Sequence, residues 1–132
     1  MIYRAELAYM RDVEPAEEPG WIRAVDRNLE LWTSNLERTA VLDANGVAAG
    51  FAMWTPQDDA ALLVTVQVLP GHRRKGHGRR LLDWFAADAA AAGVRRLELG
   101  VHRDNPARSL YEASGWTRAG EDGDYLRYTR NP

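Results

Sequence analysis

The residues of this chain that are best suited to chemistry lie in one basic, glycine-bearing segment, residues 72–80, which reads HRRKGHGRR. Gly76 and Gly78 have no side chain, so the backbone there can approach a ligand closely. A helix that begins at this point leaves about four N–H groups without partners, and its dipole favours a negative charge. Mobile cationic donors surround these amides, namely Arg73, Arg74, Lys75 and Arg79. The segment therefore predicts an anion site, and a diphosphate is the anion that fits it best.

Two familiar phosphate-binding loops do not match this segment. A Walker loop needs four residues between its glycines and then a lysine followed by Ser or Thr. A dinucleotide-binding loop needs a third glycine, where this chain has Leu81. The remaining pattern, Arg73-x-x-Gly76-x-Gly78, is by itself equally compatible with a solvated basic turn at the start of a helix. Its place between an apolar strand and a Leu-Leu helix favours the ligand site.

A second segment, residues 104–116, places a tyrosine on a short predicted helix. Asp104 and Asn105 are suitable capping residues, and Pro106 suits the first helical position. Tyr111 lies farther along this helix. From spacing alone an aromatic residue at this place is a core residue, so a chemical role for Tyr111 needs further support.

The elements that would position these two segments alternate between strands and helices. Periodicity predicts a strand over 2–7, a helix containing Trp21 to Trp32, and a hairpin of strands 39–42 and 47–54 joined at Asn45-Gly46. A loop at 56–59 leads into a central strand over 62–68, which is followed by the basic segment and a helix from Leu81 that Gly93 ends. The remaining elements are a strand over 96–101, a short helix through Tyr111 to Gly115, and a closing hairpin of 116–119 and 125–129. This order predicts one mixed α/β domain covering residues 1–132.

Composition narrows the classes of function. With 132 residues, 45% of them hydrophobic, the chain suits one globular domain. It has no cysteine, which excludes disulfides, a thiol nucleophile and a cysteine zinc site. With three histidines in no ligand-like spacing, we expect no metal. No apolar run approaches the ~20 residues of a membrane span, so we expect a cytoplasmic protein with no membrane partner.

The two motifs together resemble the GNAT (Gcn5-related N-acetyltransferase) superfamily. The segment from Val66 to Gly78 is similar to the family pattern V-x-V-x-P-x-x-R-x-x-G-x-G, and residues 104–116 are similar to N-x-x-A-x-x-L-Y-x-x-x-G-F. Asp104 stands at the usual asparagine position with Asn105 next to it, and Trp116 replaces the usual phenylalanine. The resemblance covers nearly the whole chain, although residues 1–40 match only in outline. It implies a single α/β domain with a mixed sheet, a splayed central strand pair and helices on both faces.

The resemblance also implies a reaction with acetyl-CoA as co-substrate. The pyrophosphate would bind the backbone of residues 73–78, including His77, and the pantetheine arm would pair with Val66 and Val68. The Val66 N–H would polarise the thioester carbonyl, and Asn105 would contact the pantetheine. A primary amine would attack directly, while Tyr111 would give its proton to the departing thiolate, because a phenol and a thiol have similar basicity.

The general base is not evident from the sequence, and four residues are candidates. Glu98, on the strand after the basic helix, is the one we assign, although it is also a natural ion-pair partner for Arg95 or Arg96. Asp58 and Asp59 precede the central strand, and His102 has the most suitable ordinary pKa.

Alternatives to the enzyme and the choice of acceptor stay open. An intact loop without a base would suit a non-catalytic acyl-CoA-binding or regulatory module. An acetyltransferase acting on charged tRNA is less favoured, because residues outside the basic loop hold 12 basic against 19 acidic side chains. We therefore expect no nucleic-acid partner and a small-molecule or peptide amine acceptor. The acidic N-terminal third favours a cationic acceptor, with Trp21, Trp32 and Trp54 as candidate lining residues. An exposed edge strand offers a surface for a homodimer.

Overall fold

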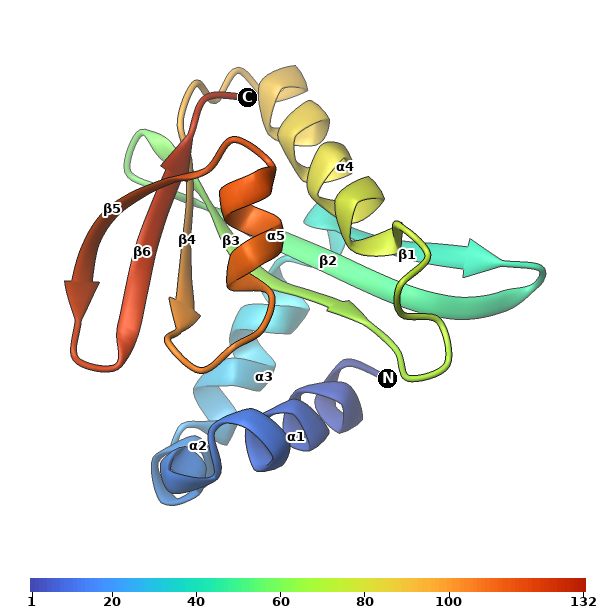
Figure 1. Cartoon of the computed structure of the whole chain (residues 1–132), viewed down its shortest axis with the longest axis vertical. Helices are drawn as coiled ribbons and strands as arrows, with labels where there is room; N and C mark the ends of the chain where they lie inside the picture. The colour runs from blue at the N-terminus through green and yellow to red at the C-terminus, as the bar shows by residue number, and fades with distance from the viewer.

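Six strands form one mixed sheet in the order β1-β2-β3-β4-β6-β5 (Figure 1). The structure is a computed structural model that describes residues 1–132. The strands are β1 (Thr39–Ala44), β2 (Val47–Gln57), β3 (Ala60–Val68), β4 (Leu97–His102), β5 (Thr117–Asp122) and β6 (Tyr125–Arg130). The helices are α1 (Ile2–Val13), α2 (Glu18–Arg23), α3 (Val25–Ser34), α4 (His77–Ala91) and α5 (Arg108–Ala113), with short 3₁₀ turns at Pro15–Glu17 and Leu36–Arg38. None of the helices is long and apolar enough to cross a bilayer.

The two central strands part shortly after they meet, which confirms the predicted splayed pair. The parallel strands β3 and β4 pair only at Ala61–Leu97 and Leu62–Glu98. On its other side β3 stays paired with β2 as far as Val68. The β2–β3 register shifts between Met53 and Trp54, where β3 contains one extra residue. Such a bulge bends a strand and turns its side chains. The second half of β3 therefore diverges from β4, and the backbone edge of β3 on that side is unpaired.

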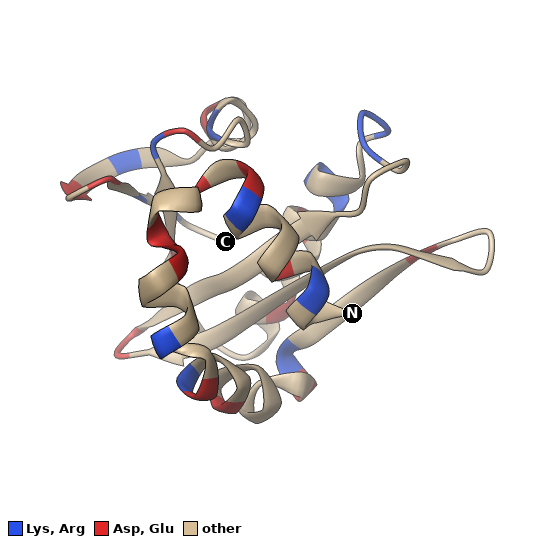
Figure 2. Cartoon of the chain, turned by 90° about the horizontal axis from the view of Figure 1, so that it is seen from below, with Lys and Arg blue, Asp and Glu red and all other residues tan.

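Helices lie on both faces of the sheet, as predicted. Helices α4 and α5 lie on one side and α3 behind, while α1 runs beneath the ends of β3 and β4 (Figure 1). The α4 residues that face the sheet recur at helical spacing and are all buried: Leu81, Leu82, Phe85, Ala86 and Ala89. Phe85 packs between the rings of Trp54 and Trp116, with centroids 6.3 Å from each. The basic loop before α4 projects from this body (Figure 2).

The first element is a helix, so the predicted strand over 2–7 was wrong. Six residues are too short a window to separate a period of 2 from one of 3.6. Over the full length of α1 the one buried residue is Met10, and the half-buried Ile2, Glu6 and Val13 precede and follow it at three- and four-residue spacing; Ala5, Leu7 and Tyr9 are half-buried as well. The continuation beyond residue 7 decides the conformation, because only a helix places these side chains on one face.

Smaller differences concern where elements begin and end. The predicted helix from Trp21 to Trp32 is two helices that meet at Ala24. Strand β2 continues through the expected loop to Gln57, and only Asp58 and Asp59 form the turn. Helix α5 begins at Arg108 rather than directly after Asn105, because residues 105–107 form a separate turn.

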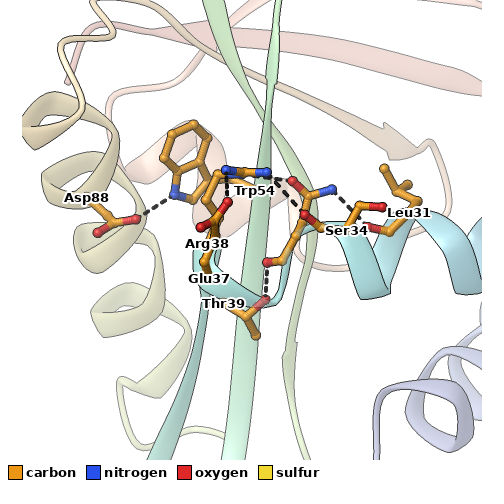
Figure 3. Close-up of polar contacts among 8 residues, drawn as sticks. Leu31, Ser34, Glu37, Arg38, Thr39, Trp54 and Asp88 are labelled. Carbon is orange, nitrogen blue, oxygen red and sulfur yellow. Dashed lines mark hydrogen bonds and ion pairs between the residues drawn. The ribbon is translucent and has the colours of Figure 1, made fainter.

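A polar network fixes the end of α3 to the sheet and to α4 (Figure 3). The Arg38 guanidinium lies over the Trp54 ring, 5.9 Å from its centroid, and its Nε donates to Asn35 Oδ1 over 2.8 Å. The Trp54 indole N–H donates to Asp88 Oδ2 on α4, also over 2.8 Å. Trp54 is therefore a core residue, and so is Trp32, which is 8% exposed; neither lines an acceptor surface.

We expect Phe85→Ala to lower the free energy of unfolding by about 3–5 kcal/mol, because it removes a fully buried ring between two tryptophans. Urea denaturation followed by tryptophan fluorescence measures this loss. Val47→Ala, at a position that is 55% exposed, is the control and should change stability by less than about 0.5 kcal/mol. A loss below about 1 kcal/mol for Phe85→Ala would contradict this description of the core.

Candidate active site

Two cavities meet where β3 and β4 part. The first, of about 360 Å³, lies between the open half of β3, β4 and α1; we name it the acidic cavity for its three glutamates, Glu6, Glu14 and Glu17. The second, of about 480 Å³, extends from the end of β3 to the start of α4 and α5; we name it the loop cavity. Five residues line both cavities: Tyr9, Val66, Gln67, Asn105 and Tyr111. The site therefore has two compartments with a shared wall.

The basic segment presents backbone amides at the start of α4. Gly76 caps the helix with φ +80°, a conformation that residues with a side chain rarely adopt. The first hydrogen bond of the helix runs from the Arg80 N–H to the Gly76 carbonyl, so the earlier amides of the first turn have no helical partner. Arg73 is anchored by its Nε, which donates to the Val68 carbonyl over 3.0 Å. This arrangement suits an anion, in agreement with the sequence pattern.

The predicted ligands of the basic segment differ in how close they lie to the loop cavity. Val66, Val68, Arg73 and Gly78 line it. A Cβ on Gly78 would approach Leu110 Cδ2 to 3.1 Å, so the close contact of α4 with α5 favours glycine there. The other predicted ligands do not line the cavity: Arg74, Lys75, Gly76 and Arg79 are exposed and His77 is half-buried. Figure 2 shows the backbone of this loop, blue at its lysine and arginine positions, projecting beside the body of the fold.

Tyr111 lies at the junction of the two cavities. It is 4% exposed and packs against the rings of Trp116 and Tyr128, with centroids 6.2 Å away. Burial raises the pKa of its hydroxyl, with no hydrogen bond contributing. Tyr111 is thus both a core residue and a cavity residue, and its hydroxyl stays protonated across the neutral range.

Asn105 joins α5 to α1. Its Oδ1 accepts a hydrogen bond from the Ala107 N–H over 2.8 Å, which gives the turn that precedes α5. Its Nδ2 donates to the Tyr9 hydroxyl over 3.0 Å. Of the two capping candidates, Asn105 rather than the exposed Asp104 lines the cavities, but its amide is held by Tyr9.

Glu6 is a functional candidate that the sequence reasoning missed. It comes from α1 and accepts hydrogen bonds from the Thr65 hydroxyl and the Gln67 side chain. Burial raises the pKa of its carboxyl, the two hydrogen bonds lower it, and the charge of Glu14 adds to the increase. The signal that could have indicated Glu6 is its helical spacing to Met10, four residues later. The strand predicted over 2–7 ends before Met10 and so does not include this spacing.

Glu14 is a second carboxylate held inside the acidic cavity. It is 9% exposed and accepts hydrogen bonds from the hydroxyls of Tyr125 and Tyr9. Burial, followed by the contact with Glu14, raises the pKa of both phenols. None of the three glutamates, Glu6, Glu14 and Glu17, forms a salt bridge within the chain.

The four candidate bases from the sequence are mostly remote from Tyr111. Glu98 lines a separate cavity and binds Arg96, with 3.1 Å between its Oε1 and Nε. Asp59 also binds Arg96, and Asp58 is part of the exposed turn beside it. The structure therefore does not bring Glu98 together with Tyr111. Only His102 shares the acidic cavity; its Nδ1 accepts a hydrogen bond from the Asp104 N–H over 3.2 Å.

One group of side chains has a geometry that a metal ion could use. Ligand atoms of Glu17, His102 and Asp124 lie within 4.8 Å of one another at the acidic cavity. No local sequence pattern indicates this group, because its members come from three distant segments. The two carboxylates are exposed, and exposed acidic groups of this kind are common without a metal.

Comparison with known proteins identifies the family of this chain. Residues 5–116 match the family described as the acetyltransferase (GNAT) family. This chain belongs to that family. The GNAT resemblance of the two motifs is thereby confirmed, and the match includes both the basic loop and Tyr111.

Individual relatives agree with this assignment. The chain is 43% identical over 81 residues, 58% of its length, to a mycothiol acetyltransferase of Kineococcus radiotolerans, but spans 26% of that protein. It is 37% identical over 79 residues, 59% of its length, to the ribosomal protein bS18-alanine N-acetyltransferase of Escherichia coli, spanning 53% of it. The chain thus spans about half or less of the length of these curated relatives.

Two solved structures share the fold. The ribosomal-protein-S18-alanine N-acetyltransferase from Escherichia coli superposes with a TM-score of 0.64 at 28% identity, over 77% of this chain and 75% of that one. The paia N-acetyltransferase from Thermoplasma acidophilum, in complex with coenzyme A, gives 0.73 at 20% identity, over 94% and 83%. At that identity the second comparison speaks to the fold alone.

We expect Glu6→Gln to stabilise the protein without ligands at pH 7 more than at pH 4. The carboxyl has a raised pKa in the folded state, so its contribution to the free energy of unfolding is fully present below about pH 4.5 and is lost as the pH rises. The unmodified protein therefore loses stability between pH 4 and pH 7 relative to the variant, because glutamine does not titrate. Urea denaturation at both pH values measures the difference, and Glu30→Gln, on the exposed surface of α3, is the control. Equal effects at the two pH values would show that Glu6 is not desolvated.

Proposed function

We propose that this chain is an acetyl-CoA-dependent N-acetyltransferase in which a primary amine attacks the thioester directly. The observation that carries this proposal is the place of Tyr111, whose buried side chain lines both cavities. One cavity leads to the amides and cations of the basic loop, and the other is lined with carboxylates. A site with these two ends suits an anionic acyl donor and a cationic acceptor that meet beside a proton donor.

The loop cavity is the proposed site of the acyl donor. The pyrophosphate would bind the free amides at the start of α4 between Arg73 and Gly78, with Arg74, Lys75, His77 and Arg79 around the rim. The pantetheine arm would lie along the unpaired edge of β3 at Val66 and Val68. A chain of amides there suits strand-like pairing, because both partners offer N–H and C=O groups. Acetyl-CoA is thus the proposed co-substrate, and the reaction proposed here needs no metal.

The chemistry of transfer needs one proton donor and one proton acceptor. The amine nitrogen forms a bond to the acetyl carbon, and the bond from that carbon to sulfur breaks. The departing thiolate takes the phenolic proton of Tyr111, which burial keeps in place at neutral pH. The Val66 N–H would stabilise the charge that develops on the carbonyl oxygen.

The known relatives support acyl transfer to an amine rather than a purely regulatory role. The Escherichia coli relative is named for acetylating an alanine of a ribosomal protein. A non-catalytic module that only binds acyl-CoA would bind the donor as well but release no CoA when amines are added. A charged tRNA remains the least favoured acceptor, because the acidic cavity repels a phosphate backbone.

We expect Tyr111→Phe to lower kcat about 10²–10⁴-fold while the affinity for acetyl-CoA changes little, because it removes only the proton donor. CoA release in the presence of amines measures kcat, and calorimetry measures binding. Tyr128→Phe is the matched control, since it removes a buried phenol that donates to Glu112 and lines neither of the two cavities. A kcat within threefold of the unmodified protein would remove Tyr111 from the mechanism.

We expect Gly76→Ala to weaken CoA binding about tenfold, as loss of one hydrogen bond to a charged group would. Gly93→Ala is the matched control, because Gly76 and Gly93 have φ of +80° and +86° at opposite ends of α4, with open space around each. Both variants should lose about 1 kcal/mol of stability from the same backbone strain. Calorimetric titration with CoA separates them, and equal affinities would contradict a phosphate site at the start of α4.

A further inference from the structure

The acidic cavity contains negative charge that no cation of the chain balances. Glu6, Glu14 and Glu17 line it, and no lysine or arginine does. Glu6 is held by the hydroxyl of Thr65 and the amide of Gln67, and Glu14 by two phenols. All of these partners are neutral.

Neutral partners satisfy the hydrogen bonds of these carboxylates but do not balance their charge. Buried charges in proteins are normally paired with an opposite charge or bound to a metal. The other carboxylates that bind arginine in this chain, such as Glu98 and Asp59, are far more exposed than Glu14. The balancing cation of the acidic cavity is therefore expected to arrive with a ligand.

A second observation points to a ligand in the same place. Tyr111 is 4% exposed, lines the acidic cavity, and has no hydrogen bond that shifts its pKa. Its hydroxyl is not among the fully enclosed atoms that lack a partner, so it opens to the cavity and is free to bind a ligand there. The unpartnered hydroxyl and the unbalanced carboxylates thus lie at one cavity, where a substrate can satisfy both.

We infer that the acceptor is an aliphatic diammonium compound, whose reacting amine lies at Glu6 and whose second ammonium lies between Glu14 and Glu17. This inference rests on the proposed acetyltransferase function and specifies its acceptor. A monoamine would balance one of the charges, and an amino acid would bring a further carboxylate into an already negative cavity. Trp21 and Tyr125 line the same cavity, and aromatic rings of this kind attract an ammonium group.

Glu6 also completes the proton balance of the reaction. The acceptor binds as an ammonium and must lose a proton before its nitrogen can attack. Glu6 takes that proton, the nitrogen bonds to the acetyl carbon, the bond from that carbon to sulfur breaks, and the departing thiolate takes the proton of Tyr111. The second proton, which the nitrogen loses as the amide forms, restores the phenol of Tyr111, and Glu6 releases its proton to solvent. A carboxylate desolvated by burial is a stronger base than an exposed one, and Thr65 and Gln67 orient it.

The size of the acidic cavity limits the length of the acceptor. Glu6 and Glu14 both line it, and the charge of Glu14 contributes to the raised pKa of the Glu6 carboxyl, so the two groups lie close enough to interact. The diamine is therefore expected to be short, with an alkyl chain of four or five carbons between its nitrogens. A cavity of about 360 Å³ accommodates such a chain.

The test compares acceptors of one length and different charge. The probes are 1,4-diaminobutane, butylamine, 4-aminobutanoate and a short peptide with an N-terminal alanine, each measured by CoA release, with the product identified by mass spectrometry. We expect kcat/KM for the diamine to exceed that for butylamine by about ten- to a hundredfold, as one more charge-assisted contact predicts. The aminobutanoate and the peptide should be poorer still.

Variants identify the groups responsible. Glu14→Gln and Glu17→Gln should each reduce the ratio of kcat/KM between diamine and butylamine at least fivefold. Glu6→Gln should instead lower kcat for both amines. Glu30→Gln removes one acidic charge of the N-terminal helices away from the cavity and should keep the ratio. Because Glu14 is buried and its loss can unfold the chain, the exposed Glu17 gives the decisive result.

The outcomes separate this inference from the proposed function. Rapid CoA release with equal use of all amines, or a preference for the peptide, would overturn the diammonium acceptor and leave the acetyltransferase intact. A diamine preference that disappears with EDTA would show that a metal at Glu17, His102 and Asp124 balances the charge, and would also overturn it. Acetyl-CoA binding without release of CoA to any amine would overturn both.

Discussion

The parting of β3 and β4 after Leu62 is the constraint on which the other features of the site depend. Where the strands separate, the backbone of β3 loses the partner that a continuous sheet would give it, and unpaired backbone groups are costly in a closed interior. The extra residue in β3 turns Thr65 and Gln67 toward α1, and Val66 toward the core beside α4. One local irregularity thus creates the space between the strands and assigns different side chains to its two sides.

Helix α1 lines both parts of this space. Tyr9 lines both cavities; Glu6 and Glu14 line the acidic cavity, whereas Ala5, Ala8 and Asp12 line the loop cavity. The cations of the chain that belong to the site all come from the loop before α4. A donor with phosphates and an acceptor with ammonium groups are therefore attracted to opposite ends, which aligns the two substrates before any covalent step occurs.

Local patterns were sufficient for some parts of the site and not for others. The glycine loop and the Leu110-Tyr111 helix are short motifs, whose residues lie close together in both sequence and space, so the sequence could indicate them. Glu6 reaches Thr65 across 59 positions, and nothing in the local pattern of either residue indicates that contact. Glu98 was assigned from its neighbourhood in the sequence, but its side chain lines a different cavity from Tyr111. Residue roles that depend on packing between distant elements need the fold.

The choice of phenols, rather than arginines, as partners for buried carboxylates has a physical consequence. An arginine beside Glu14 would neutralise it within the chain and occupy the space that a ligand needs. Tyr9 and Tyr125 instead supply hydrogen bonds while they remain neutral, because burial and the nearby carboxylate raise the pKa of both hydroxyls. The carboxylate keeps its geometry and its attraction for a cation. Stability is reduced by the unbalanced charge, and binding of a cation would recover it, which links occupancy of the cavity to the stability of the fold.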